Sequence, residues 1–137
     1  MELDSFSHMC GQLTYHVVLV TKYRKRVFIT NGRRYVCENI LKWSGRKYGI
    51  RMIKLKVLDD HVHLFVKIPP KMSVSEFFNK IKGCSSRRIL MMYPDMRKEL
   101  KGDSLWTRGK FVRTVGSTTD KAVEYYIEHS QYKHLQD

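Results

Sequence analysis

Two adjacent segments in the middle of the chain alternate between apolar and polar residues, which is the pattern of half-buried β-strands. Residues 50–58 carry two sets of side chains on opposite faces: Ile53, Leu55 and Val57 on one, and Met52, Lys54 and Lys56 on the other. Residues 61–68 alternate in the same way: Val62, Leu64, Val66 and Ile68 against His61, His63, Phe65 and Lys67. Asp59 and Asp60 supply turn chemistry between the two segments. The pattern therefore predicts a β-hairpin whose two histidines share the face opposite the core.

Apolar residues at helical spacing lie on both sides of this hairpin. Before it, residues 31–48 place four apolar side chains at that spacing: Val36, Cys37, Ile40 and Leu41. We expect this helix to end at Gly45 or Gly49. After the hairpin, the sequence SVSE at residues 73–76 has the spacing of a capping box, and it begins a helix that we expect to reach about Met92.

Two further strands and a last helix complete the pattern. Residues 15–21 form a β-branched, apolar run typical of a buried strand, and residues 111–115 predict a fourth strand. A turn at residues 116–119 then opens a helix through about Lys133. The order βαββαβα predicts an α+β, ferredoxin-like fold: a four-stranded antiparallel sheet with two helices on one face, an open opposite face, and an added C-terminal helix. A chain of 137 residues builds one core, so we expect a single domain over residues 1–137.

Positive charge is concentrated in the first half of the chain. The 26 Lys and Arg residues against 13 Asp and Glu residues give a formal net charge of +13. Residues 21–58 contain twelve basic side chains and one acidic one, Glu38, and such a one-sided field favours a polyanion such as nucleic acid. No apolar run approaches the roughly 20 residues of a membrane span, and the N-terminus has no signal-peptide pattern. Three dispersed cysteines indicate a reducing compartment, so we expect a cytoplasmic protein.

His61 and His63 are the first candidates for chemistry. Residues at i and i+2 of a strand point the same way, which brings two imidazoles close enough to hold one divalent cation. Asp60 is either a further ligand or a carboxylate that orients one of the rings. The alternative is a pair of ordinary surface histidines, because an H-x-H pattern occurs by chance.

Tyr125 and Tyr126 on the last predicted helix are the second candidates. A tyrosine hydroxyl is a nucleophile for phosphoryl transfer, especially beside a cation that stabilises the phenoxide; the alternative is ordinary helix packing.

The basic, aromatic loop at residues 106–111 (WTRGKF) suits unstacked bases and phosphates, or its aromatic rings cap the core. Arg87 and Arg88 likewise grip a phosphate backbone or form a solvated helix face.

Five stretches of the chain resemble, in order and spacing, the single-tyrosine TnpA transposases of the IS200/IS605 insertion-sequence group. They are HVVLVTKYRKRVF at 16–28, DHVHLFVKIPPKMSVS at 60–75, KGCSSRRIL at 82–90, LWTRGKFVRTVG at 105–116 and YIEHSQ at 126–131. The resemblance spans nearly the whole chain and implies a ferredoxin-like fold of the His-hydrophobe-His nucleases. It also implies a homodimer that cleaves and rejoins single-stranded DNA at hairpins near the element ends, and therefore a protein that acts on nucleoid DNA.

By this resemblance, His61 and His63 match the pair that binds a divalent metal ion, Mg²⁺ or Mn²⁺, and Tyr126 matches the nucleophile. The family usually places a glutamine four residues after that tyrosine as a third ligand, whereas this chain has Ser130 there and Gln131 one residue later. At about 100° per helical residue, Gln131 lies about 140° around the helix from Tyr126. Ser130, His129, Gln131 or a water is therefore the candidate third ligand, or Tyr125 works with His129 in place of Tyr126.

Seven residues are candidates for DNA contact: Lys22, Arg24, Lys54, Arg87, Arg88, Trp106 and Arg108. Two other functions remain open. One is a ferredoxin-like module that binds nucleic-acid hairpins without cleaving them, although such modules carry aromatic residues where this chain has His61, His63 and Lys54. The other is a related single-tyrosine nuclease that acts on repeated genomic hairpins.

Overall fold

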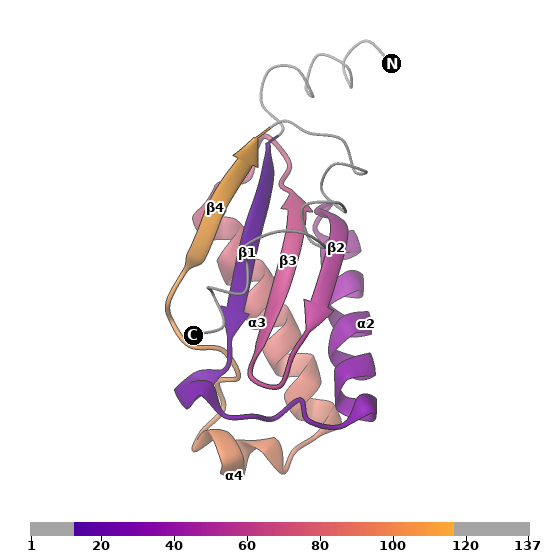
Figure 1. Cartoon of the computed structure of the whole chain (residues 1–137), viewed down its shortest axis with the longest axis vertical. Coiled ribbons are helices and arrows are strands. Elements are labelled where there is room, and N and C mark those ends of the chain that lie inside the picture. Colours follow the sequence, from indigo (N-terminus) through magenta and orange to yellow (C-terminus); the bar gives the residue numbers. More distant parts are fainter. Residues whose placement is uncertain (1–12, 117–137) are drawn as a thin grey trace.

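The computed structural model of the chain describes residues 13–116, which form four strands, two long helices and two short helical segments (Figure 1). In chain order these are β1 (Thr14–Val20), the 3-10 helix η1 (Lys22–Arg24), α2 (Asn31–Lys47), β2 (Arg51–Val57), β3 (His61–Lys67), α3 (Val74–Met92), α4 (Met96–Leu100) and β4 (Phe111–Gly116). The sheet order is β2-β3-β1-β4 and every neighbouring pair is antiparallel. The predicted ferredoxin-like sheet is therefore confirmed, while the predicted C-terminal helix lies outside the described residues.

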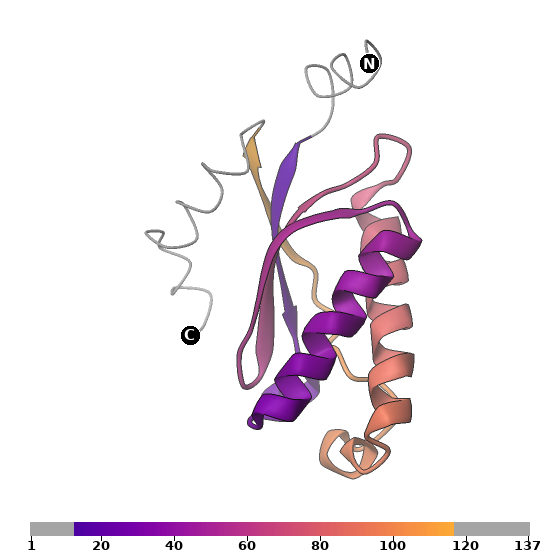
Figure 2. The same ribbon diagram turned by 90° about the vertical axis from the view of Figure 1, so that its right-hand side faces the viewer.

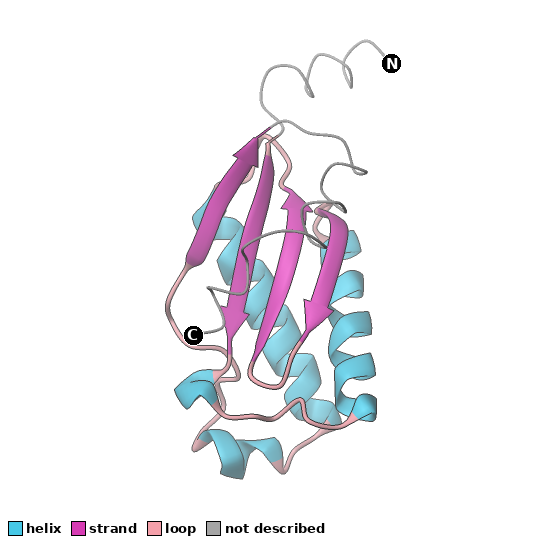
Figure 3. Cartoon of the chain, in the orientation of Figure 1, coloured by secondary structure: helices cyan, strands magenta, loops and turns pink. Residues whose placement is uncertain are grey.

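Helices α2 and α3 lie on the same face of the sheet, which gives two layers (Figures 2 and 3). The core between the layers comes from one face of the strands and from the apolar stripes of both helices. Its fully buried members include Val17, Leu19, Leu41, Val62, Leu64, Val66, Phe77, Phe78 and Ile81. Val62, Leu64 and Val66 match the predicted apolar face of the third strand, and Leu41 matches that of the first long helix.

Helix α3 begins with the predicted capping box. The backbone N–H of Glu76 donates to the Ser73 hydroxyl at 3.0 Å, and the Ser73 N–H donates to the Glu76 carboxylate at 3.2 Å. Each bond satisfies a backbone donor that would otherwise have no partner at the helix start, and such a cap contributes about 1 kcal/mol. After Pro94 the chain makes the short helix α4, which the sequence did not predict and which buries Met96 and Leu100.

Strand β2 contains a bulge that overturns part of the predicted face assignment. Met52 pairs with Val66 and Lys54 pairs with Phe65, so Ile53 is the extra residue. Met52 consequently packs on the core with Leu55 and Val57, whereas Ile53 does not. Gly45 lies within α2 and packs against the Met52 side chain: a Cβ at position 45 would approach Met52 Cγ to 3.1 Å. The helix instead ends near Gly49, whose φ of 69° suits glycine.

The sheet face opposite the helices carries a group of buried aromatic rings. Within residues 13–116 no helix covers this face (Figure 2), yet His16, His61, His63 and Phe65 are all at most 4% exposed. The predicted sheet face without helices is therefore confirmed for the described residues, although the side chains on its two central strands are buried. The rings pack on one another there: His16 stacks on Phe65, and His63 contacts both His16 and His61.

Candidate active site

Strand β3 places His61 and His63 side by side on the face away from the helices. Their ring centres are 5.0 Å apart and their planes are nearly perpendicular, at 78°. Two imidazoles that bind one ion through Nε2 have ring centres roughly 4.5 to 5.5 Å apart, because each nitrogen lies about 2.1 Å from the ion. The spacing of the pair therefore suits a shared divalent cation.

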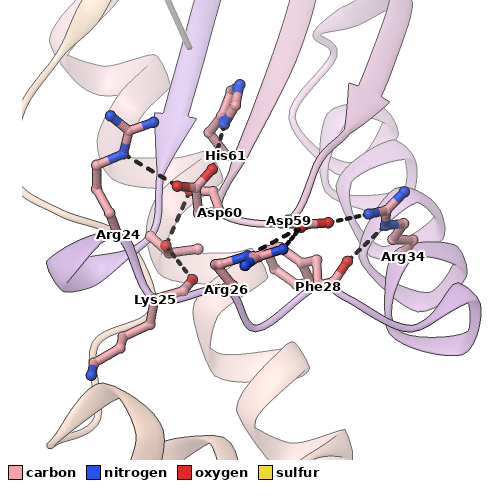
Figure 4. A network of polar contacts seen from close by, with 9 residues as sticks. Arg24, Lys25, Arg26, Phe28, Arg34, Asp59, Asp60 and His61 are labelled. Atoms are coloured by element: carbon pink, nitrogen blue, oxygen red, sulfur yellow. Dashed lines mark hydrogen bonds and ion pairs between the residues drawn. The ribbon is translucent and has the colours of Figure 1, made fainter. Parts of the chain in front are cut away.

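The Asp60 carboxylate orients the His61 ring through a contact with Nδ1 of that ring. That nitrogen lies 2.7 Å from one carboxylate oxygen of Asp60, and the other oxygen accepts a hydrogen bond from Arg24 Nε at 3.3 Å (Figure 4). A carboxylate fixes the proton on Nδ1, which leaves a lone pair on Nε2. The Nε2 atom of His61 is buried and has no hydrogen-bond partner within residues 13–116. Of the two roles predicted for Asp60, the geometry favours the orienting one, because both of its oxygens are engaged.

The basic segment after β1 folds beneath the hairpin turn and fixes the position of Asp60 (Figure 4). The backbone N–H of Thr21 donates to the Asp60 carbonyl at 3.0 Å, and the Thr21 hydroxyl donates to the same carbonyl at 3.1 Å. Asp59, the other turn residue, accepts hydrogen bonds from Arg26 and Arg34, and the bond from Arg26 is the main cause that lowers the pKa of its carboxyl group. The predicted turn is thus tied to the segment that precedes α2.

His16 on β1 belongs to the same site, although its sequence context gave no indication of it. Its Nε2 atom lies 3.0 Å from Nδ1 of His63, and its ring stacks on Phe65 with centroids 4.4 Å apart and planes 8° apart. In the antiparallel register His16 lies opposite Phe65, so His63 is its diagonal neighbour. Only the pairing of β1 with β3 brings these rings together, and a strand that is apolar on both faces does not reveal which of its residues lies where.

Burial keeps His16 and His63 neutral near pH 7. Desolvation, together with the charge of Arg113, lowers the pKa of His16 to about 4. Desolvation is also the main cause that lowers the pKa of His63 to about 3, and the neighbouring His16, His61 and Lys56 add to it. Neutral imidazole is the form that binds a metal ion.

The described part of the chain supplies the histidine pair but not a complete ligand set. Within residues 13–116, no group of three or more His, Cys, Asp and Glu side chains is arranged to hold an ion. The predicted nucleophile Tyr126, its neighbour Tyr125 and the candidate third ligands His129, Ser130 and Gln131 all lie outside the described residues.

Three of the predicted DNA contacts lie on β2 or in the turn after β1, the segments next to the strand that carries the histidine pair. Lys54 pairs with Phe65 and is exposed on the histidine face of the sheet. Arg24 reaches Asp60, as described above, and together with Tyr23 it adopts a left-handed backbone with φ of 51° and 59°. Lys22 occupies the same turn and is half-buried beside the Tyr23 ring. Positive charge therefore lies next to the candidate metal pair.

Arg87 and Arg108 line a basic cavity of about 660 Å³ between α3 and the loop at residues 103–110. This cavity lies on the helix side of the molecule, away from the histidine face. Three further basic residues line it: Lys82, Arg97 and Lys110. Lys82 holds the loop in place, because its ammonium group donates to the Thr107 and Gly109 carbonyls at 2.8 Å each. Partial burial and the nearby Lys110 lower the pKa of Lys82.

The remaining two predicted contacts have different surroundings. Arg88 lies over the Trp43 ring, 3.8 Å from its centre, and borders an apolar groove with exposed Met91 and Met92. Trp106 is 4% exposed, and its indole N–H donates to the Ser85 hydroxyl at 2.9 Å. The Trp106 ring therefore belongs to the core, and this arrangement does not offer it for base stacking. Of the two interpretations of the WTRGKF loop, packing on the core is confirmed for Trp106.

A four-stranded antiparallel sheet with two helices on one face and a histidine pair on the other defines an α+β protein of the ferredoxin-like type. Comparison with known proteins gives its family. Residues 10–130 match the family described as Transposase IS200 like, and the chain belongs to that family. Among the helices of residues 13–116, none has the length and apolar character to cross a membrane.

Relatives support the same assignment. The chain is 35% identical over 125 residues to the "Transposase for insertion sequence element IS200" of Salmonella typhimurium, covering 91% of this chain and 81% of that protein. It is 31% identical over 122 residues to the "ISDra2 transposase TnpA" of Deinococcus radiodurans, covering 89% and 86%. The crystal structure of a putative transposase from Deinococcus radiodurans R1 matches with a TM-score of 0.69 at 30% identity, over 85% and 89% of the two chains.

A more distant solved structure shares the fold. It is the REP-associated tyrosine transposase bound to a REP hairpin, with a TM-score of 0.57 at 11% identity, covering 90% of this chain and 67% of that one. The family match and the relatives at 31% and 35% identity support a transposase function and confirm the resemblance that the sequence motifs carry.

Proposed function

We propose that the protein is a metal-dependent transposase that cleaves and rejoins single-stranded DNA through a 5′-phosphotyrosine on Tyr126. The observation that carries the proposal is the buried pair His61 and His63, with ring centres 5.0 Å apart and one ring held by Asp60, in a chain of the IS200-like transposase family. A divalent cation, Mg²⁺ or Mn²⁺, supplies positive charge to a non-bridging oxygen of the scissile phosphate when it is bound there.

In this mechanism Tyr126 is the nucleophile. Its hydroxyl oxygen forms a bond to phosphorus, the bond from phosphorus to the 3′ oxygen breaks, the phenol loses its proton and the 3′ oxygen gains one. The products are a 5′-phosphotyrosine and a free 3′-hydroxyl. Because the covalent link conserves the energy of the phosphodiester, a second 3′-hydroxyl reverses the step on another strand without ATP.

His61 and His63 would hold the ion through the Nε2 lone pairs of their rings, and the surrounding residues keep these two rings in place. Asp60 fixes the proton on Nδ1 of His61, and the turn that carries Asp60 is anchored to Thr21 and to Arg24. Exposed Lys54 supplies positive charge on the same face, where it attracts the phosphate backbone.

In this proposal, two surfaces of the protein bind different parts of the DNA. The histidine face receives the cleavage site, and the basic cavity with Arg87 and Arg108 grips the folded part of the strand, a hairpin near the element end. The distant structural neighbour that is bound to a REP hairpin supports such a ligand. We also propose a homodimer: β4 is an edge strand of the sheet, and its Phe111 and Val112 side chains are exposed at 46% and 37%.

The test is incubation of the full-length protein with labelled single-stranded DNA from around its own gene, with and without Mn²⁺ or Mg²⁺, followed by a denaturing gel. We expect a covalent protein–DNA adduct only with the ion and only with the single strand; the same sequence as a duplex is the control. If the protein bound the DNA but formed no adduct with either ion, the supported function would be that of a hairpin-binding module without cleavage activity. Flanking DNA without imperfect hairpins would instead favour a nuclease that acts on repeated genomic hairpins.

A further inference from the structure

We infer that His16 is a positioning residue that fixes the tautomer and orientation of His63, so that Nε2 of His63 presents a lone pair to the cation. The inference deepens the proposed function, because it rests on the assignment of His63 as a metal ligand. The contact that carries it is the distance of 3.0 Å between Nε2 of His16 and Nδ1 of His63.

The hydrogen bond between these two rings has two possible directions. If His16 donates from Nε2, Nδ1 of neutral His63 is the acceptor, and the proton of His63 must sit on Nε2, where it blocks metal binding. If His63 donates from Nδ1, Nε2 of His63 carries a lone pair. Only the second direction is compatible with His63 as a ligand, so His16 acts as the acceptor.

The ring of His16 is held firmly in the position where its Nε2 atom meets Nδ1 of His63. It is 1% exposed and stacks on Phe65, with centroids 4.4 Å apart and planes 8° apart. The two strands involved, β1 and β3, are the central pair of the sheet, and His16 lies directly opposite Phe65 in their register. The backbone and the stacked ring therefore fix where Nε2 of His16 lies.

Each of the two proposed metal ligands then has a hydrogen-bond partner at Nδ1, and the two partners differ chemically. His61 meets the carboxylate of Asp60 at 2.7 Å, while His63 meets a neutral imidazole at 3.0 Å. Such outer contacts orient a histidine and set its basicity, and their loss typically reduces metal affinity 10- to 100-fold. An apolar side chain at position 16 would fill the same space without a hydrogen bond, which separates the positioning role from simple packing.

The variants His16→Phe and His16→Gln test the inference. Phe keeps an aromatic ring for the stack and removes the acceptor, whereas the Gln side chain has an amide oxygen at about the position of Nε2. We expect His16→Phe to weaken Mn²⁺ binding, measured by calorimetry on the full-length protein, by 10- to 100-fold. We expect His16→Gln to recover most of that loss. Equal Mn²⁺ affinity in His16→Phe and the unmodified protein would overturn the inference.

The tautomer is measured directly by ¹⁵N NMR of the histidine rings in the metal-free protein, with His63 assigned by the signal that disappears in His63→Gln. We expect the proton on Nδ1 of His63; a proton on Nε2 would overturn the inference, and this result needs no His16 variant to fold. A protein with this tautomer and with Mn²⁺ bound at His63, but without any covalent DNA adduct, would refute the proposed function and leave the role of His16 intact.

Discussion

Nδ1 of His61 lies 2.7 Å from the carboxylate of Asp60, the residue immediately before it in the chain. This contact joins the turn of the β2–β3 hairpin to the first candidate metal ligand. Because the turn is also bonded to Thr21 and Arg24, the position of His61 depends on two segments that are far apart in the sequence, residues 21–24 and 59–61.

Asp60→Ala removes the carboxylate that orients His61. We expect Mn²⁺ affinity to fall 10- to 100-fold, because the His61 ring loses the acceptor that keeps its proton on Nδ1. Calorimetric titration with Mn²⁺ measures the effect. The matched control is Asp59→Ala in the same turn, whose carboxylate contacts Arg26 and Arg34 and no histidine. Equal losses in the two variants would mean that the turn, and not the contact with His61, supports the site.

His61→Ala and His63→Ala each remove one of the two nitrogen ligands. We expect either change to eliminate metal-dependent cleavage while binding of a single-stranded hairpin stays within about threefold, since the basic cavity lies on the other side of the sheet. A cleavage gel and a filter-binding assay on the same preparations separate the two effects. Unimpaired cleavage in both variants would end the metal hypothesis.

Arg87→Gln combined with Arg108→Gln removes two cations from the basic cavity. Each phosphate contact on a duplex hairpin stem contributes about 0.9 to the slope of log affinity against log salt concentration, so we expect the slope to decrease by about 1.8. Fluorescence anisotropy over a range of salt concentrations gives this slope. Lys42→Gln is the control, because Lys42 lies on α2 and pairs with Glu38. A slope that is unchanged in the double variant would show that the cavity does not contact phosphates.

Gly45 and Gly83 both lie within helices but differ in their surroundings. Alanine at position 45 would place its Cβ 3.1 Å from Met52 Cγ and 3.2 Å from the Ile50 carbonyl oxygen, while nothing lies within 4 Å of a Cβ at position 83. We expect Gly45→Ala to lower the free energy of unfolding by about 1 kcal/mol, since overpacking exceeds the gain in helix propensity. Gly83→Ala should raise it by about 0.5–1 kcal/mol. Urea denaturation measures both, and stabilisation by Gly45→Ala would contradict the packing of Met52 on α2.

Local patterns in the sequence predicted the fold because most elements here follow local rules. The capping box at Ser73, the helical spacing in α2 and α3 and the alternation in β3 all depend on residues a few positions apart. The bulge at Ile53 was not predictable, because one extra residue in β2 exchanges the faces of its neighbours without altering the composition of the strand. Helix α4 has five residues, too few to show a period.

The candidate site was only partly predictable, because local patterns report contacts between residues a few positions apart and not contacts made by strand pairing. His61 and His63 are two residues apart on one strand, so their shared face follows from the sequence alone. His16 joins them through strand pairing over 47 positions, which no local pattern reports. Trp106 shows another limit: its basic loop left base stacking and packing on the core equally open, and contacts with Ser85 and Phe28 bury the ring.

The position of the covalent bond tests the central claim most directly. The protein is incubated with single-stranded DNA from its own flanks and Mn²⁺, then digested, and the peptide that carries the nucleotide is identified by mass spectrometry. We predict the nucleotide on Tyr126, no adduct from Tyr126→Phe, and a normal adduct from Tyr125→Phe. A nucleotide on Tyr125, with Tyr126→Phe still reactive, or the absence of any adduct with either ion, would contradict the account.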